Sequence, residues 1–256
     1  MVLPLYDEAP ANRVSPPFVT FGLIAVNAVV FLIALSLPEA SLEAAYAAYG
    51  LKPVAFTGPE AFFGAYGRYV DFVTYQFLHG GLLHFAGNML FLWVFGDNVE
   101  DAFGHARFLA FYLLCGIAGG IVYVLSAPGS GAAMIGASGS AAGVLAAYLM
   151  IRPCAKVEVL LYVWPVKMAA YWVIGLWIAS QILHVASRSE GDVAWWCHLG
   201  GLGAGALLTL GLRQPGVALF ECMRPAAVPV DAKAPWTKRM GTRALAGEQA
   251  AGKPMD

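Results

Sequence analysis

Long apolar runs, separated by shorter polar or proline-containing segments, make up most of the chain. The runs cover residues 18–37, 82–99, 108–126, 138–151, 168–186 and 193–212. A helix of about 20 apolar residues crosses a hydrocarbon core about 30 Å thick. The pattern therefore predicts an all-α membrane protein with six transmembrane helices.

The remaining residues predict two tails and two longer loops. Residues 1–17 are polar and proline-rich and predict a short N-terminal tail, whereas the basic residues 213–256 predict a disordered C-terminal tail. The first loop, 38–81, holds ten tyrosines and phenylalanines, and such rings favour the headgroup layer. We expect this long first loop to lie partly in the membrane interface and residues 152–167 to form a simple loop. The membrane domain is then 18–212.

Composition agrees with this class of protein. Hydrophobic residues make up 59% of the chain and charged residues 12%, with a mean hydropathy of +0.67. These values exclude an ordinary soluble globule of this size. The four cysteines have no metal-like spacing, so we expect buried thiols rather than disulfides.

The positions of lysine and arginine predict the orientation. With the N-terminus inside, twelve of them fall on inner segments, and only Lys52, Arg68 and Arg188 fall on outer loops. Cytoplasmic segments carry the excess of positive charge. Both termini are therefore predicted to be cytoplasmic, and residue 138 to lie near the outer face.

Ser138 begins the shortest apolar run, within the small-residue stretch 134–143. A helix from Ser138 to Ile151 is only about 21 Å long at ~1.5 Å per residue, which places the serine several ångströms below the membrane surface. Small residues at this depth are a usual means of close helix packing, and a buried serine often bonds to its own helix. The hydroxyl is therefore either part of a packing surface or a nucleophile.

His198 lies near the outer end of the last run, at a depth similar to that of Ser138. Gly139 and Gly143 give one helix a small-residue face, and Gly201 and Gly205 give one to the other. Two such faces can meet at short range and bring the histidine to the serine. An imidazole supplies the base that a serine nucleophile needs, although a lone histidine can also simply bond to a carbonyl.

A second polar set starts the 82–99 run. His84 and Asn88 are four residues apart, on one helical face, and both can donate hydrogen bonds toward a developing oxyanion. The competing hypothesis is a metal site on His79, His84 and His198. No carboxylate or cysteine accompanies these histidines at the same depth.

Three motifs resemble those of the rhomboid family of intramembrane serine proteases, bacterial type. They are Gly-x-Ser-Gly at Gly136–Gly139, the histidine followed by a residue and two glycines at His198–Gly201, and His-x-x-x-Asn at His84–Asn88. The resemblance covers residues 15–212 and implies a six-helix rhomboid bundle with a long first loop. It also implies that the fifth span and residues 187–194 gate the site.

The resemblance implies a Ser138–His198 dyad without a catalytic aspartate. His84, Asn88 and the Ser138 backbone amide would form the oxyanion hole. Ala142 stands where some relatives place a tyrosine under the histidine ring, so the support of His198 is unexplained. Two further departures are Val70-Asp71, in place of a Trp-Arg pair, and Cys197, in place of alanine.

The implied activity is that of a serine endopeptidase that cleaves single-span membrane proteins within or near the bilayer. It needs no metal or cofactor, and its partners are transmembrane segments and lipid, not nucleic acid. The expected location is a bacterial inner membrane. One alternative is a catalytically inactive relative that binds transmembrane helices in trafficking or quality control; a weaker one is a small-solute transporter.

Overall fold

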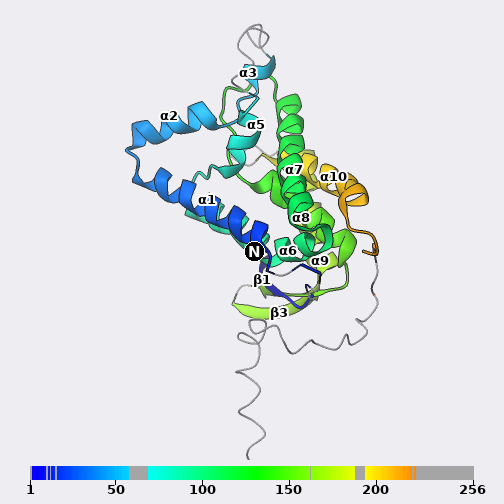
Figure 1. Cartoon of the computed structure of the whole chain (residues 1–256). Helices are drawn as coiled ribbons and strands as arrows, with labels where there is room; N and C mark the ends of the chain where they lie inside the picture. Colours follow the sequence, from blue (N-terminus) through cyan, green and yellow to red (C-terminus); the bar gives the residue numbers. More distant parts are fainter. Residues whose placement is uncertain are drawn as a thin grey trace, which may run out of the picture. The chain divides into compact units, whose positions relative to one another are not determined.

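The computed structural model describes residues 2–9, 11, 13–14, 16–57, 69–161, 163–187, 194–220 and 222, and these are mostly helical (Figure 1). In chain order the helices are α1 (Phe18–Ser36), α2 (Glu39–Tyr49), α3 (Val54–Thr57), α5 (Asp71–Thr74), the 3-10 helix η2 (Tyr75–Phe77), α6 (Leu82–Phe103), α7 (His105–Ser126), α8 (Ser138–Ile151), α9 (Ala170–Ala186) and α10 (Trp195–Leu212). The strands are β1 (Val2–Asp7), β2 (Lys156–Leu161) and β3 (Trp164–Ala169).

A helix occupies each of the six apolar runs. Within the described residues, α1 and α7 are long and apolar enough to span a membrane by themselves. Residues Asp71–Phe77 and Leu82–Phe103 meet the same requirement together but are bent by 98°, and α8 and α9 are shorter apolar helices. The structure thus supports two or three spans, and the count of six stays a prediction.

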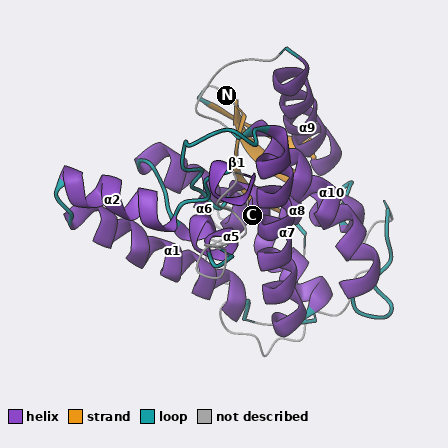
Figure 2. Ribbon diagram, turned by 90° about the horizontal axis from the view of Figure 1, so that it is seen from above, coloured by secondary structure: helices purple, strands orange, loops and turns teal. Residues whose placement is uncertain are grey.

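The short helix α8 is the central helix of the fold. Eleven of its fourteen residues are buried, and it packs against α6, α7, α9 and α10. Figure 2 shows α7, α8 and α10 side by side. Glycine, alanine and serine let neighbouring helices approach closely, which explains how so short a helix is surrounded.

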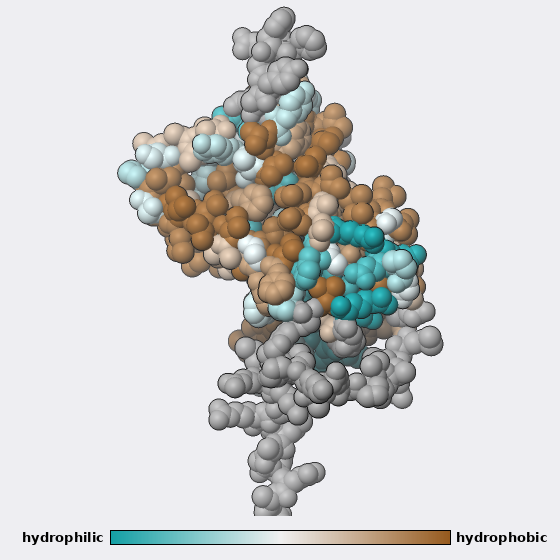
Figure 3. Space-filling view, in the orientation of Figure 1, coloured by the Kyte–Doolittle hydropathy of each residue, from teal (hydrophilic) through white to brown (hydrophobic). Residues whose placement is uncertain are grey.

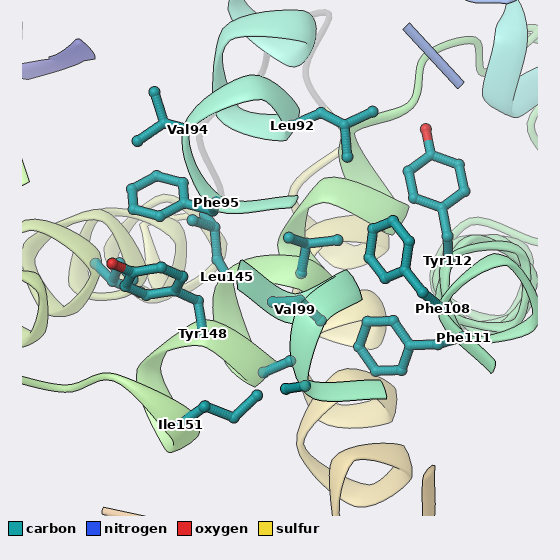
Figure 4. Packing of buried hydrophobic residues seen from close by; sticks show 14 of the residues in the cluster. Leu92, Val94, Phe95, Val99, Phe108, Phe111, Tyr112, Leu145, Tyr148 and Ile151 are labelled. Atoms are coloured by element: carbon teal, nitrogen blue, oxygen red, sulfur yellow. The ribbon is translucent and has the colours of Figure 1, made fainter. Parts of the chain in front are cut away.

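Large side chains fill the space between α6, α7 and the second half of α8 (Figure 4). Phe95 of α6 meets Tyr148 of α8 edge to face at 4.8 Å between ring centroids, and Phe103 meets Phe111 of α7 at 4.9 Å. Such edge-to-face pairs are worth about 0.5–1.5 kcal/mol beyond their buried area. The aromatic core therefore fixes one end of α8, while small residues surround the other.

A three-stranded antiparallel sheet corrects the prediction of a simple loop over 152–167. Strand β2 lies in the middle, paired with β3, which follows it in the chain, and with β1 from the N-terminus. Pro4 and Pro165 lie in the two edge strands, where a missing N–H is tolerated. The sequence pattern does not reveal this sheet, because β1 pairs with a segment about 150 residues away.

A disulfide between Cys154 and Cys222 corrects the expectation that all four cysteines are free. The chain after α10 folds back so that Phe220 N–H donates to the Met150 carbonyl at 2.7 Å, which brings the two cysteine Cα atoms to 5.2 Å. The other two cysteines are buried and free, as predicted. Residues beyond 222 in the predicted disordered tail lie outside the described residues.

Glu100, near the end of α6, is a fully buried carboxylate that joins three helices. It accepts hydrogen bonds from the backbone N–H groups of Val19 at 2.9 Å and Thr20 at 2.7 Å, and from the Thr20 hydroxyl at 2.7 Å. Its second partner helix is α7, because His105 Nδ1 lies 2.5 Å away. The first N–H groups of a helix have no partner within it, so Glu100 caps the start of α1.

Asp7 of β1 is buried against α6 and α8. Its Oδ2 accepts from Asn98 Nδ2 at 3.0 Å and from the Tyr148 hydroxyl at 2.5 Å. Burial raises the pKa of the Asp7 carboxyl to about 7; the Tyr148 hydrogen bond opposes that rise, and the nearby charge of Asp97 adds to it. The sheet is thus attached to the helices through a carboxyl group that titrates near neutral pH.

Apolar side chains are also exposed on the outer helices. On the face in Figure 3 they cover α1 and α7. In α1, for example, Phe18, Val29 and Leu32 are each more than half exposed. An apolar patch of this extent is typical of a surface that meets lipid or another protein. Together with the apolar helices, it indicates an integral membrane protein.

Candidate active site

The loop that leads into Ser138 is held by the first loop. Leu51 and Met134 exchange two backbone hydrogen bonds of 2.9 Å, and Gly136 N–H donates to the Tyr75 carbonyl at 2.9 Å. Leu51 and Tyr75 are both buried, at 0% and 1% exposure. The aromatic first loop therefore positions the backbone that precedes the serine.

Gly136 brings His84 and Asn88 to this backbone. Its φ of +131° lies in the region that favours glycine. A Cβ added there would lie 2.6 Å from His84 Nε2 and 3.8 Å from Asn88 Nδ2. Glycine is thus required both by the turn and by the approach of the two side chains predicted to donate to an oxyanion.

Ser138 is the first residue of α8 and is partly buried. Ala137 precedes it as the N-cap and supplies no side-chain hydrogen bond to the helix. The first backbone N–H groups of a helix have no partner within it, and the helix dipole makes this end of α8 electropositive. Ser140, two residues later, differs: it is fully buried, and its hydroxyl donates to Gln76 Oε1 at 2.9 Å.

The glycine faces of α8 and α10 meet, as predicted. A Cβ added at Gly201 would lie 2.0 Å from the Gly139 carbonyl oxygen, and one at Gly205 would lie 2.5 Å from that of Gly143. Gly139 also faces Cys197, whose Sγ would be 2.7 Å from an added Cβ. Because Gly139 and Cys197 are the sequence neighbours of Ser138 and His198, the two predicted catalytic residues lie at the same level of adjoining helices.

His198 is buried, at 7% exposure, in the first turn of α10. Its Nδ1 lies 2.7 Å from Oε1 of Gln181 on α9. The distance between ring centroids is 5.8 Å from His198 to Trp177 and 5.9 Å from His198 to Trp195. In the described part of the chain, no hydrogen bond joins His198 to Ser138. The pairing of these two residues as a catalytic dyad therefore stays a prediction.

Gln181, Trp177 and Trp195 are the surroundings that sequence reasoning missed. They explain what supports His198 when residue 142 is alanine. The available signal was the spacing of Trp177 and Gln181, which are four residues apart and so share one face of α9.

Two polar side chains near the site lack partners. Asn88 Nδ2 and both ring nitrogens of His79 are buried without a hydrogen bond to any described residue. His79 lies against His84, with 5.3 Å between ring centroids. Among the described residues, no three His, Cys, Asp or Glu side chains are arranged to hold a metal ion, so the alternative metal site gains no support.

The gate predicted over residues 187–194 falls largely outside the described residues, which leave out 188–193 and therefore Gly191. Its flanks are described. His184, near the end of α9, stacks on Trp195 at the start of α10 with 4.1 Å between ring centroids. This ring contact joins the end of α9 to the start of α10.

Comparison with known proteins identifies relatives. The family model for the rhomboid domain matches residues 66–215, more than half of the chain. The rhomboid protease GluP of Bacillus subtilis is 40% identical over 98 residues, which are 38% of this chain and 19% of GluP. Rhomboid protein 1, mitochondrial, of Saccharomyces cerevisiae is 30% identical over 148 residues, 54% of this chain and 40% of the relative.

A plant relative, RHOMBOID-like protein 5 of Arabidopsis thaliana, is 39% identical over 72 residues, which are 28% of this chain and 23% of the relative. The matched stretch spans less than half the length of each of these relatives.

Proposed function

The chain belongs to the rhomboid family, and from this premise we propose that it is an intramembrane serine endopeptidase that cleaves single-span membrane proteins within or near the bilayer. The observation that carries the proposal is the glycine contact between α8 and α10, which sets Ser138 and His198 at one level. The similarity to GluP, which is named a rhomboid protease, supports the same reaction class.

In the proposed reaction, Ser138 Oγ attacks the carbonyl carbon of the scissile peptide bond while His198 Nε2 takes the hydroxyl proton. The tetrahedral intermediate collapses, the C–N bond breaks, and His198 returns the proton to the leaving amine. Water then attacks the acyl-enzyme, with His198 again as the base, and releases Ser138. A serine hydroxyl is a weak nucleophile alone, so the imidazole is the activating group.

The negative charge of the intermediate needs donors that are in place beforehand. The Ser138 amide lies at the electropositive start of α8, and His84 Nε2 and Asn88 Nδ2 converge on Gly136, two residues earlier. Asn88 Nδ2 is buried without a partner among the described residues. An unpaired buried donor lowers the stability of a fold by about 1–3 kcal/mol. A donor that binds the oxyanion of the intermediate would account for its being kept.

We place the protein in a bacterial inner membrane as a multi-pass chain of six spans with both termini in the cytoplasm. The excess of lysine and arginine on inner segments supports this orientation. The structure gathers the N-terminal strand, the 152–169 hairpin and the chain after α10 near the second half of α8. These segments would share the cytoplasmic side, and Ser138 would open to the other.

A helical substrate span must unwind before attack, because its carbonyls are bonded within the helix. Unwinding costs least at glycine and proline, so spans that carry them are the expected substrates. Small side chains at the cleaved bond are favoured by the glycine and alanine residues around Ser138. The outer end of α9 and the segment after it would admit the substrate.

The experiment is cleavage of a single-span fusion protein with Gly and Pro in its span, co-reconstituted in liposomes. We expect Ser138→Ala and His198→Ala each to lower turnover by at least about 10⁴-fold, and the double variant to be no worse, because the two residues act as a unit. Thermal unfolding of each variant controls for folding. Cleavage that persists in either folded variant would exclude the dyad, and a folded but inactive wild type would favour the helix-binding alternative.

A further inference from the structure

Gln181 of α9 is a buried amide, 3% exposed, that faces the imidazole of His198. The distance from Gln181 Oε1 to His198 Nδ1 is 2.7 Å, the length of a good hydrogen bond. None of the steps proposed above uses this residue. It is nevertheless the hydrogen-bonding partner of the histidine among the described residues.

The surrounding bonds determine which way the amide points. Gln181 Nε2 lies 3.1 Å from the Trp177 carbonyl oxygen, an atom that can only accept. Nε2 also lies 2.9 Å from Ser180 Oγ, and that hydroxyl already donates to the Trp177 carbonyl at 2.6 Å, so it accepts from Gln181. The NH₂ group is therefore fixed on the α9 side, and Oε1 is the atom that faces His198.

An amide oxygen can only accept, so the proton in the bond to His198 belongs to Nδ1. In a neutral imidazole one nitrogen carries the proton and the other is the acceptor. We propose that Gln181 is a positioning residue that holds His198 in the tautomer protonated at Nδ1 and thereby leaves Nε2 as the base for Ser138. A buried carboxylate has this task in serine proteases with a catalytic triad; here a neutral amide performs it.

Two aromatic rings complete the support. Trp177 lies tilted against the His198 ring at 35°, and Trp195 meets it edge-on at 88°. These contacts restrict the plane of the imidazole, whereas the amide selects its protonated nitrogen. The arrangement also explains how the histidine is supported with only Ala142 at the position of the family's tyrosine.

The inference rests on the proposed protease function for its catalytic consequence, but the tautomer can be measured without activity. The ¹⁵N NMR spectrum of ¹⁵N-histidine-labelled protein in lipid distinguishes protonated from unprotonated ring nitrogens. The chain has five histidines, and the signal lost in His198→Ala assigns the residue. We expect Nδ1 protonated and Nε2 unprotonated near pH 8, and a mixture of tautomers in Gln181→Met.

Cleavage kinetics supply the second readout. Gln181→Met keeps the length of the side chain but has no acceptor oxygen, and we expect kcat to fall about 10-fold to 100-fold with little change in KM. Gln181→Glu restores an acceptor and should recover most of kcat near pH 8. Its carboxylate stabilises the imidazolium, so the acidic limb of its rate–pH profile should move to higher pH. A residue that only tied α9 to α10 would not move this limb.

The outcomes separate the two hypotheses. An unprotonated Nδ1 in the wild-type protein, or full kcat in folded Gln181→Met, would overturn the role of Gln181. A wild type that has the expected tautomer but does not cleave would overturn the protease function and leave the positioning role standing. Because the NMR measurement uses the wild-type chain, the inference can be tested even if Gln181→Met does not fold.

Discussion

The two ends of α8 use polar groups in opposite ways. At the serine end, which comprises the first turns of α6, α8 and α10, Ser138 Oγ and Asn88 Nδ2 have no partner among the described residues. At the acid end, formed by Glu100, Asp7 and the groups bonded to them, both carboxyl groups accept several hydrogen bonds. Glu100 alone has four hydrogen-bond contacts.

The difference separates structural from chemical roles. Both ends bury polar atoms, and burial without a partner costs free energy that a fold normally avoids. At the acid end the partners come from distant segments and join them, so the polar groups stabilise the fold. At the serine end the donors remain available, which is the arrangement that a reaction with a developing negative charge needs.

Removing Glu100 should have the largest effect on the fold. Glu100→Ala leaves the Thr20 hydroxyl and the first N–H groups of α1 unpaired in the interior, and we expect a loss of about 3–5 kcal/mol of stability. Thermal unfolding in detergent measures it. Glu43→Ala, on the exposed surface of α2, is the matched control and should stay within about 0.5 kcal/mol of wild type. Equal stability of the two variants would contradict a structural role for the acid end.

Removing an oxyanion donor should affect turnover instead. We expect Asn88→Ala and His84→Ala each to lower kcat by about 10²–10³ with less change in KM. Asn98 lies on the same helix, is also buried, and bonds to Asp7 at the acid end, so Asn98→Ala is the matched control. It should lower the melting temperature and leave kcat per folded molecule near that of wild type. Equal changes in kcat and in melting temperature for Asn88→Ala and Asn98→Ala would contradict the division between a chemical and a structural end.

The pH dependence of stability tests the acid end at a single residue, Asp7. Its pKa in the fold is about 7, above the ordinary 3.8, so the folded state binds the proton more tightly than the unfolded state. Stability should therefore fall as pH rises from about 4 to about 7, by no more than about 1.4 kcal/mol per pH unit. Asp7→Asn keeps an oxygen acceptor but cannot ionise, and its stability curve should lack this slope. Parallel curves for variant and wild type would show that Asp7 does not titrate in this window.

The serine end could be largely predicted from the sequence, because its information is local. Gly136, Ser138 and His198 lie in short motifs, and the glycine spacing of two helices was enough to predict that α8 and α10 touch. Gln181 was missed since a glutamine in an apolar helix has no motif, and only packing shows which atom it faces.

The contacts of the acid end could not be predicted either, because they join residues that are far apart in the chain. Asp7 belongs to a segment that reads as a tail, and it becomes buried only when β1 pairs with β2. The disulfide likewise joins cysteines 68 positions apart, and nothing near either residue indicates the other. Long-range pairing depends on the arrangement of the helices, which a local pattern does not specify.

The proposed reaction requires Ser138 to be a nucleophile that His198 activates. Labelling of the purified protein with a fluorophosphonate, located by mass spectrometry, tests it most directly. We expect modification of Ser138 in the wild type, no label in Ser138→Ala, and strongly slowed labelling in His198→Ala. Ser140→Ala should label normally, because the Ser140 hydroxyl of the wild type is buried against Gln76. A folded wild-type protein that carries no label at Ser138, or labelling that does not depend on His198, would contradict it.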